Sequence, residues 1–464
     1  MTKANRHRLF TGALLIVVAV GVWRLHEHNL RQAETVRDEA YVPKPEKITP
    51  EILLLQQYVR IDTSNPPGKE LAGARWLFDK LASSGIRSEI IESAPGRASV
   101  YSRLKGKRAG EGLLLLSHID VVPVDPRQWE RPPFSAAILI NNMWGRGTLD
   151  MKGITVCELE AFIAASRAGR VPERDVVFLA TADEEQGSTF GLRWLLEHRP
   201  DVVAGVRYAI NEGGVTETLK ETLTYFGIET GSKQIVSVQL LGATRDALRR
   251  ARIALEPTFI SHEPDRVLPD VRRYFHEIAP YRVEDGPLLD NIDRTIAEGK
   301  FWLIPRTYRE LAQNVVFVEG AVETDHRWTM KAHLINLPDE LPERRLAWLE
   351  SAVEPFGVTL GPVLRSEGPV PLTPANTLFF ALMRREIRRV YGNVPVGTTI
   401  LSASTNDSRF LRKRGIDCYG IWPFPVDLYQ TRGIHGVNER IRLDWFQQGV
   451  TLTRELVASY AFGR

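Results

Sequence analysis

The chain has 464 residues, of which 43% are hydrophobic and 25% are charged, with 60 Lys and Arg residues against 57 Asp and Glu residues. A formal net charge of +3, with the basic residues dispersed along the chain, gives no reason to expect nucleic-acid binding. The only two cysteines, Cys157 and Cys418, exclude a disulfide framework and a thiolate zinc cluster. This length exceeds that of one ordinary domain and predicts two domains with accessory segments.

The N-terminus contains an uncharged stretch, LFTGALLIVVAVGVW, at residues 9–23, between Arg8 and Arg24. This pattern is typical of a signal peptide or a signal anchor, and no small-residue cleavage site follows it. We therefore predict a retained single-pass anchor over residues 1–24, with the catalytic body extracytoplasmic. The stretch spans about 22 Å as a helix, less than the bilayer core, so both arginines are expected to extend toward the headgroups. An ordinary apolar helix of the fold is the alternative, which the basic flanks disfavour.

Residues 25–46 are polar, end in VPKPEK and predict a stalk. The globular body follows, with Thr49 as a helix N-cap and Pro50 at the first helical position. Strand and helix patterns then alternate, which predicts an α/β sheet with helices on both faces. The segments are an apolar strand at 113–120, a helix at 154–168, a strand at 175–185, a helix at 189–198 and a strand at 207–214.

The middle of the chain has a different pattern of predicted helices and strands. Residues 233–369 contain patterns for two helices and about four strands, separated by a long charged stretch, and predict a compact α+β unit. From residue 370 the helix and strand pattern of the first part returns. We therefore predict one catalytic domain in two parts, 47–232 and 370–464, interrupted by an inserted domain at 233–369.

Acidic and histidine residues stand at the ends of the predicted strands or in the loops that follow. Side chains two residues apart in a strand point the same way, so His118 and Asp120 share a face. In open α/β sheets, ligands bind beyond the carboxyl ends of the strands, and we expect these groups to converge in one crevice. The set comprises His118, Asp120, Asp150 in the glycine-rich WGRGTLDMKG, Glu184, Glu185 and Glu212.

Several carboxylates crowded into one crevice repel one another, so a cation is needed to hold them together. Oxygen and imidazole ligands without a thiolate suit zinc or another first-row divalent ion such as Co²⁺ or Mn²⁺. The ligands outnumber those that one zinc requires. They favour two ions, roughly 3.5–4 Å apart, that share a bridging carboxylate.

Seven short motifs together resemble those of the M20 family of dinuclear zinc metallohydrolases, which includes carboxypeptidases, dipeptidases and aminoacylases. They are RIDTSNPPG, SHIDVVP, GRGTLDMKG, TADEEQGS, NEGG, STNDSRF and GIHGVNE, in the family's order. The resemblance covers nearly all of 47–232 and 370–464. It implies a zinc-exopeptidase-like sheet flanked by helices, with the inserted domain acting as a lid that folds over substrate and often forms a homodimer interface.

The resemblance assigns five metal ligands, residue by residue. It implies that His118 and Glu212 bind one zinc ion, that Glu185 and His435 bind the other, and that Asp150 bridges the two.

The resemblance also implies roles for residues beside the ligands. Asp120 would hydrogen-bond the second ring nitrogen of His118, and Glu184 would be the general base. A substrate carboxylate would be held by Arg409, whose fork-shaped guanidinium suits it. Possible hydrogen-bond donors beside that guanidinium are Thr405, Asn406 and Ser408.

The lid departs from the family pattern. Where the family has a histidine that reaches the scissile carbonyl, this chain reads VQLLGATRDALRRA, and the later asparagine-valine-proline segment is replaced by GAVETDHRWTMKAHL. The candidate replacements are His262, His326 and His333. This departure bears on the substrate, the lid and the dimer, and it leaves the metal ligands untouched.

The sequence therefore predicts a membrane-anchored dinuclear zinc hydrolase. Its expected substrate is a small peptide or an N-acyl amino acid, cleaved at an amide bond next to a free carboxylate. One alternative is a non-catalytic, metal-stabilised binding or scaffold protein. A second alternative is an M28-type aminopeptidase, which the large insert between Glu212 and His435 and the motif GTLDMKG disfavour.

Overall fold

The computed structural model describes most of the body of the chain. The described residues are 48–219, 221–256, 264–324, 327–366, 368–401, 405–426, 428–431 and 433–463. The predicted anchor and stalk, residues 1–24 and 25–46, lie outside them. Within the described ranges, no helix has the length and apolar character needed to cross a bilayer.

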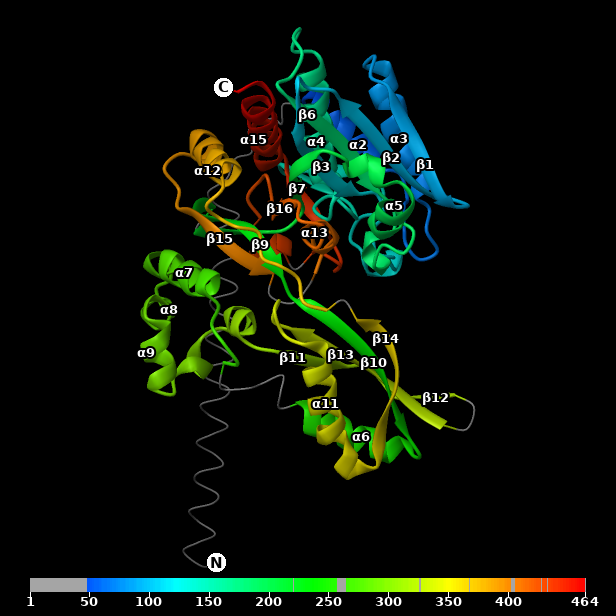
Figure 1. The fold of residues 1–464 in the computed structure, drawn as a ribbon, viewed down its shortest axis with the longest axis vertical. Coiled ribbons are helices and arrows are strands. Elements are labelled where there is room, and N and C mark those ends of the chain that lie inside the picture. Colours follow the sequence, from blue (N-terminus) through cyan, green and yellow to red (C-terminus); the bar gives the residue numbers. More distant parts are fainter. Residues whose placement is uncertain are drawn as a thin grey trace, which may run out of the picture. The chain divides into compact units, whose positions relative to one another are not determined.

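A mixed sheet of nine described strands forms the centre of the body, in the order β1-β2-β6-β3-β7-β16-β9-β15, with β8 paired to β9 (Figure 1). Strand β3 runs parallel to β6 and β7, and β7 runs parallel to β16. The predicted α/β fold is confirmed. The strands are β1 (Ser88–Ala94), β2 (Arg97–Leu104), β3 (Arg108–His118), β6 (Arg174–Thr181), β7 (Val206–Asn211), β8 (Val215–Leu219), β9 (Thr222–Ser232), β15 (Val396–Leu401) and β16 (Asp417–Gly420).

Helices cover both faces of this sheet. One face carries α2 (Pro50–Val59), α3 (Glu70–Ser83), α4 (Lys152–Ser166), α12 (Leu378–Tyr391) and α15 (Leu443–Phe462), and the other carries α5 (Leu192–His198) and α13 (Ser408–Arg412). The apolar run of β3 reflects this layering: Leu113 and Leu115 belong to the first core, and Leu114 and Leu116 to the second. A strand that is buried on both faces needs apolar residues at every position.

A small three-stranded sheet lies beside the central one. It consists of β4 (Ala137–Leu139), β5 (Asn142–Trp144) and β17 (Arg440–Arg442), in the order β17-β5-β4. Strand β17 precedes α15 and pairs antiparallel with β5, which precedes α4. This pairing joins two segments that are about three hundred residues apart in the sequence.

A second, antiparallel sheet lies wholly within residues 233–369, the predicted inserted domain. Its order is β11-β13-β10-β14, with β12 paired to β13, and α6 and α11 pack against one face. Strand β9 continues almost directly into β10, and this continuous ribbon links the two sheets (Figure 1). The elements are β10 (Gln234–Gly242), α6 (Arg245–Leu255), β11 (Val315–Val318), β12 (Val322–Thr324), β13 (Arg327–Asn336), α11 (Pro342–Val353) and β14 (Val358–Ser366).

The predicted count of two helices in the inserted segment is wrong. The described part of the stretch between α6 and β11 also folds into short 3₁₀ turns and four further helices, α7 (Pro269–Ile278), α8 (Gly286–Asp290), α9 (Ile292–Ala297) and α10 (Arg306–Arg309). These helices do not join the core of the second sheet. They form their own apolar cluster with Tyr225 of β9 and Ile400 of β15, at the edge of the central sheet. Asp270 at the start of α7 accepts hydrogen bonds from Thr230 and Thr398 on the same two strands. Helix α14 (Leu428–Thr431) precedes the His435 loop.

Candidate metal centre

Three neighbouring parallel strands deliver four of the predicted site residues to one edge of the central sheet. His118 is the last residue of β3, and Glu212 directly follows β7. Glu184 and Glu185 open a short 3₁₀ turn after β6. Because β6, β3 and β7 are adjacent and parallel, their carboxyl ends meet at the same edge.

The carboxylate of Asp150 lies between two histidines. Its Oδ1 is 3.0 Å from Nε2 of His118, and its Oδ2 is 3.1 Å from Nε2 of His435. Glu185 Oε2 is also 3.1 Å from Nε2 of His435, and Glu212 Oε1 is 3.8 Å from Nε2 of His118. The structure thus brings all five predicted ligands together, with one Asp150 oxygen directed to each histidine.

Two overlapping sets of potential ligand atoms occur among the described residues. Within each set all atoms lie within 4.8 Å of one another: one contains His118, Asp150 and Glu185, and the other contains His118, Glu184 and Glu212. Membership of Glu184 in the second set places this predicted base beside the ligands. Carboxylate oxygens and imidazole nitrogens at this spacing are the donors that zinc and similar divalent ions take.

The electrostatics of the protein alone show that a cation fits this site. Burial and the nearby charge of Asp150 raise the pKa of Glu212 to about 8. Hydrogen bonds to Asp150 and Glu185 raise the pKa of His435 to about 11. Protons therefore compensate the crowded negative charge when no metal is bound. In addition, Oε1 of Glu185 is buried without a hydrogen-bond partner among the described residues, as expected for an atom that has a ligand role.

Asp120 plays a different part from the one predicted. Nδ1 of His118 lies 2.9 Å from the main-chain carbonyl oxygen of Asp120, whereas the carboxylate is 3.6 Å away. A carbonyl oxygen only accepts, so Nδ1 carries the proton and Nε2 stays available to a metal. The Asp120 carboxylate instead accepts the main-chain N–H groups of Glu184 and Glu185, at 3.1 and 3.2 Å. It thereby holds the turn that carries the predicted base and one predicted ligand.

Sequence reasoning missed a polar network behind this turn. Asn65 donates from Nδ2 to the carboxylates of both Asp120 and Asp183, at 2.9 Å each. Arg97 donates to Asp183 at 2.6 Å and to Glu70 at 2.7 Å. Asn65 and Asp183 lie inside the motifs RIDTSNPPG and TADEEQGS, so the motifs contained the signal, but their hydrogen-bond partners come from distant segments.

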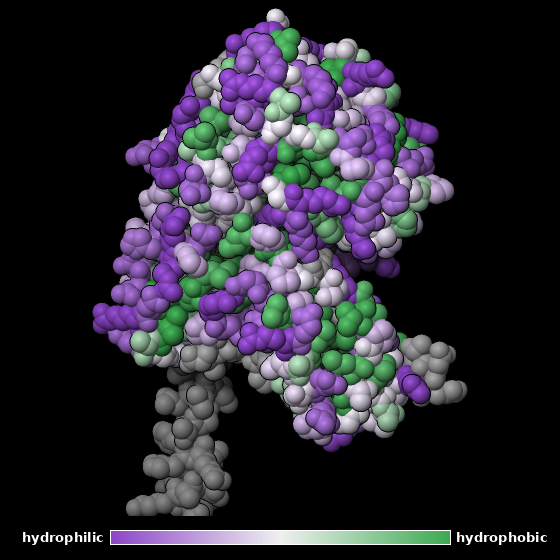
Figure 2. Space-filling model, in the orientation of Figure 1, coloured by the Kyte–Doolittle hydropathy of each residue, from purple (hydrophilic) through white to green (hydrophobic). Residues whose placement is uncertain are grey.

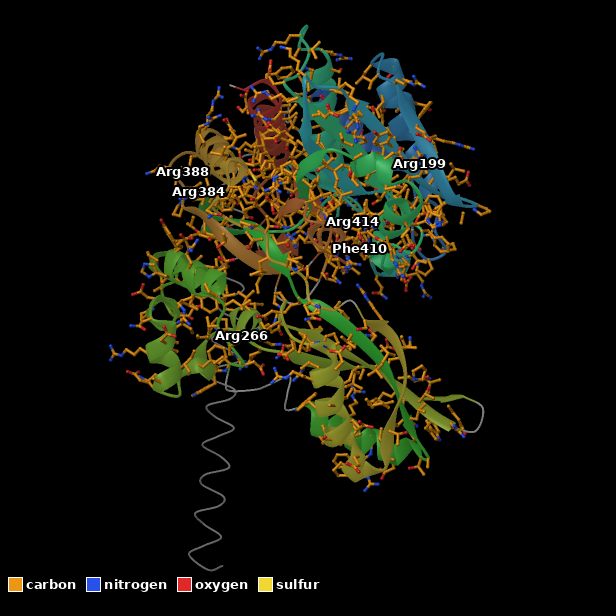
Figure 3. The ribbon with its side chains drawn as sticks, in the orientation of Figure 1. Arg199, Arg266, Arg384, Arg388, Phe410 and Arg414 are labelled. Carbon is orange, nitrogen blue, oxygen red and sulfur yellow. The ribbon has the colours of Figure 1, made fainter. Side chains whose placement is uncertain are left out.

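Arg409 lies beside the predicted base. Its side chain is 1% exposed, and its Nη1 is 3.9 Å from Oε1 of Glu184 and 3.7 Å from Oδ1 of Asp407. The guanidinium stacks over the ring of Phe410 at 4.2 Å. Figure 3 labels Phe410 next to Arg414, which donates to the carbonyl of Leu196 and so ties the turn after α13 to α5. A role of Arg409 in substrate binding stays a prediction.

The other three predicted substrate contacts form hydrogen bonds within the protein. Asn406 donates to the main-chain carbonyl of Glu212 at 2.9 Å, and Ser408 accepts from Nδ2 of Asn211 at 3.1 Å. Thr405 Oγ1 lies 3.3 Å from the hydroxyl of the last residue of β9. Asn406 and Ser408 are buried and hold the end of β7, next to the predicted ligand Glu212. Direct contact of these three residues with a substrate stays a prediction.

The candidate replacements for the missing lid histidine have different outcomes. His262 and His326 lie outside the described residues. His333 lies on β13, with Nδ1 2.8 Å from the hydroxyl of Ser237 and Nε2 3.0 Å from Glu319. Both of its ring nitrogens are therefore engaged inside the second sheet.

The fold and this ligand arrangement define a hydrolase of the metallopeptidase class. The model of peptidase family M20/M25/M40 matches residues 114–459, and the chain belongs to this family. The membership confirms the predicted family and a hydrolytic enzyme, and it decides against the M28-type alternative.

Two curated relatives and one solved structure show the extent of the similarity. Aminoacylase-1A of Rattus norvegicus is 27% identical over 427 residues, which cover 90% of this chain and 97% of the relative. The human N-fatty-acyl-amino acid synthase/hydrolase PM20D1 is 24% identical, with 81% and 79% coverage. The M20 family metallo-carboxypeptidase Sso-CP2 from Sulfolobus solfataricus superposes with a TM-score of 0.67 at 21% identity, and the match covers 89% of this chain and 100% of that one. The last similarity shows the shared fold.

Proposed function

We propose that this protein is a membrane-anchored, two-zinc hydrolase that cleaves an amide bond next to a free carboxylate, in a small peptide or an N-acyl amino acid. The observation that carries the proposal is the Asp150 carboxylate, whose two oxygens face His118 and His435 at 3.0 and 3.1 Å. A carboxylate that serves two separate histidines is the arrangement a bridged pair of ions requires.

The donor set divides into two groups around Asp150. His118 and Glu212 would hold one ion with Oδ1, and Glu185 and His435 would hold the other with Oδ2. When bound, such a pair of ions polarises the scissile carbonyl and lowers the pKa of a water molecule.

Glu184 supplies the proton transfers. Burial, followed by the charge of Glu212, raises its pKa well above the usual value in the protein alone, so this carboxyl readily holds a proton. A base must accept a proton from water and then deliver it to the leaving amine nitrogen. Glu184 stands beside His118 and Glu212 on a turn fixed by the Asp120 carboxylate, and this fixed position suits both transfers.

The substrate class rests on Arg409 and on the relatives. A buried guanidinium 3.9 Å from the base would place a substrate carboxylate next to the bond that is cleaved. The names of the relatives refer to N-acyl amino acids and to carboxypeptidase activity, which both involve an amide adjacent to a free carboxylate.

Removal of the substrate carboxylate is expected to lower kcat/KM by about 100-fold, because the charge-assisted hydrogen bonds between that carboxylate and the buried guanidinium are lost. The measurement compares a series of N-acyl amino acids and dipeptides with their C-terminal amides, with zinc added. Arg409→Lys, which keeps the charge but loses the fork, is expected to reduce this preference. Equal rates for the acids and the amides would contradict the assignment. Absence of turnover on every substrate would favour the binding or scaffold alternative.

The anchor and the dimer belong to the same proposal. The uncharged residues 9–23 between basic flanks support membrane attachment with the body outside. Exposed apolar side chains of the inserted domain, Phe317, Val363 and Leu364, support a homodimer through it. On the face drawn in Figure 2, hydrophobic residues lie among hydrophilic ones over this domain.

Full-length protein is expected to remain in the membrane fraction after carbonate extraction, because the uncharged segment is not cleaved off. The control is a version in which residues 1–24 are replaced by a cleavable export signal from another protein. It is expected in the soluble fraction. Soluble full-length protein with a new N-terminus beyond Arg24 would show that the segment is a cleaved signal peptide.

A further inference from the structure

Two ligand-bearing loops meet at one end of the small sheet. Strand β5 leads into the loop with Asp150, and the loop with His435 leads into β17. The two strands pair directly, with Trp144 opposite Arg440, and the pairing extends by a hydrogen bond from Gly145 N to the main-chain oxygen of Glu439. The bridging ligand and a ligand of one ion are therefore carried on neighbouring loops.

Glu439, from the His435 loop, holds the Asp150 loop. Its carboxylate is 0% exposed and accepts the main-chain N–H groups of Gly147 at 2.9 Å, Leu149 at 2.8 Å and Asp150 at 3.2 Å. Three amides on one carboxylate fix the path of the backbone that ends in the bridging ligand.

Arg146, from the Asp150 loop, holds the His435 loop in return. Its side chain is 2% exposed and donates to Glu439 Oε2 at 2.5 Å, to the carbonyl of Gly436 at 2.6 Å and to that of Gly433 at 3.4 Å. The two carbonyls flank His435, whose φ of 57° lies in the left-handed region that non-glycine residues rarely adopt. The arginine thus holds the backbone on both sides of His435, the ligand whose own backbone conformation is unfavourable.

This reciprocal contact, the Glu439–Arg146 latch, needs an explanation beyond stability. A buried ion pair is often no more stable than apolar residues of the same size, because both charges lose their water. Neither residue belongs to the ligand sets among the described residues. The latch connects two ligands that are nearly three hundred positions apart, and partners of this kind set the affinity of a metal site.

We propose that Glu439 and Arg146 are positioning residues that set the affinity of the metal position formed by Asp150, Glu185 and His435. The unshared ligands of the other position, His118 and Glu212, stand at the ends of β3 and β7 and have no hydrogen bond to the latch. The inference rests on the proposed two-metal centre, and it adds that the two positions depend on the latch to different degrees.

The test is a titration of metal-free, full-length protein with Co²⁺, followed by its visible absorption and by calorimetry. The wild type is expected to bind in two steps. In Glu439→Gln, which keeps the shape but loses the charge and one acceptor, one of the two steps, that of the position formed by Asp150, Glu185 and His435, is expected to lose affinity by about 10–100-fold. The other step is expected to change by less than about threefold. Arg146→Lys, which retains a charge but not the fork, is expected to show the same selective loss.

Asp175→Asn is the matched control. Asp175 is a largely buried carboxylate that accepts from Arg103 and from the main-chain N–H of Gly106, at the opposite end of β6. Its loss is expected to lower the melting temperature, as the loss of Glu439 does, with both Co²⁺ steps unchanged. This comparison separates a general loss of stability from an effect on the metal position.

The outcomes are distinguishable. Two unchanged steps in folded Glu439→Gln, or an equal weakening of both steps, would overturn the latch and leave the two-metal centre in place. If neither latch variant folds, the pair is needed for folding, and this result would also overturn the inference. If the wild type itself takes up no Co²⁺, the two-metal centre fails, and the latch fails with it.

Discussion

Glu184→Gln is expected to lower kcat by about 10²–10⁴-fold while the bound metal and KM change little. Glutamine has the same shape as glutamate but cannot accept a proton from water. Because Glu184 lies within 4.8 Å of ligand atoms on His118 and Glu212, it is also a potential ligand, and the substitution decides between the two roles. The measurements are steady-state kinetics on an N-acyl amino acid and elemental analysis of the same preparation.

The control for this substitution is Glu197→Gln on α5, where the side chain is exposed and pairs with Arg193. It is expected to keep full activity. Full activity of Glu184→Gln would place the base elsewhere. A loss of activity together with the loss of one metal equivalent would make Glu184 a ligand and contradict its role as the base.

Asp150→Asn is expected to remove both metal ions and all measurable hydrolysis. An amide offers one neutral oxygen, whereas the Asp150 carboxylate presents an anionic oxygen to each of His118 and His435. Loss of a residue that hydrogen-bonds a ligand lowers metal affinity by roughly 10–100-fold. Loss of the bridging ligand itself is expected to lower the affinity for each ion by more than that. Metal content is measured by elemental analysis after gel filtration in zinc-free buffer. The expected change is from two equivalents to less than one.

Asp125→Asn is the matched control for the bridge. Asp125 lies in the same half of the chain, in an exposed turn where it pairs with Arg127. This variant is expected to retain both ions and full activity. Two retained equivalents in Asp150→Asn would contradict the bridging role, and a single retained equivalent would show that Asp150 serves only one position.

The strand-end residues of the site could be predicted from the sequence because a simple rule applies to them. An apolar run that ends in His118, or in Asn211 before Glu212, marks the carboxyl end of a buried strand, where α/β sheets bind ligands. His435 follows no strand, and only the resemblance of GIHGVNE to the family motif indicated it. The structure then placed it against Asp150 through the pairing of β5 with β17.

The remaining features depend on long-range hydrogen bonds that have no local pattern. The Asp120 carboxylate was expected to hydrogen-bond His118, but the main-chain carbonyl of Asp120 lies closer to the ring nitrogen, at 2.9 Å against 3.6 Å. The carboxylate instead accepts the main-chain N–H groups of Glu184 and Glu185. The partners of Glu439 lie 289 to 293 residues earlier in the sequence.

The helices α7–α10 were missed for a different reason. Helices α8, α9 and α10 have only 5, 6 and 4 residues, too few to show a helical period. Helix α7 does carry its buried residues Val271, Tyr274, Phe275 and Ile278 at helical spacing, so its signal was present in the sequence within the charged stretch. Their packing against β9 and β15 becomes visible only in three dimensions.

An anomalous difference map, from crystals of the zinc-loaded protein with data collected at the zinc edge, tests the central claim most directly. The account predicts two peaks, roughly 3.5–4 Å apart, one on each side of the Asp150 carboxylate. One peak is expected next to His118 and Glu212, and the other next to Glu185 and His435. A map without a peak at Asp150, or with its zinc bound elsewhere in the molecule, would contradict the account.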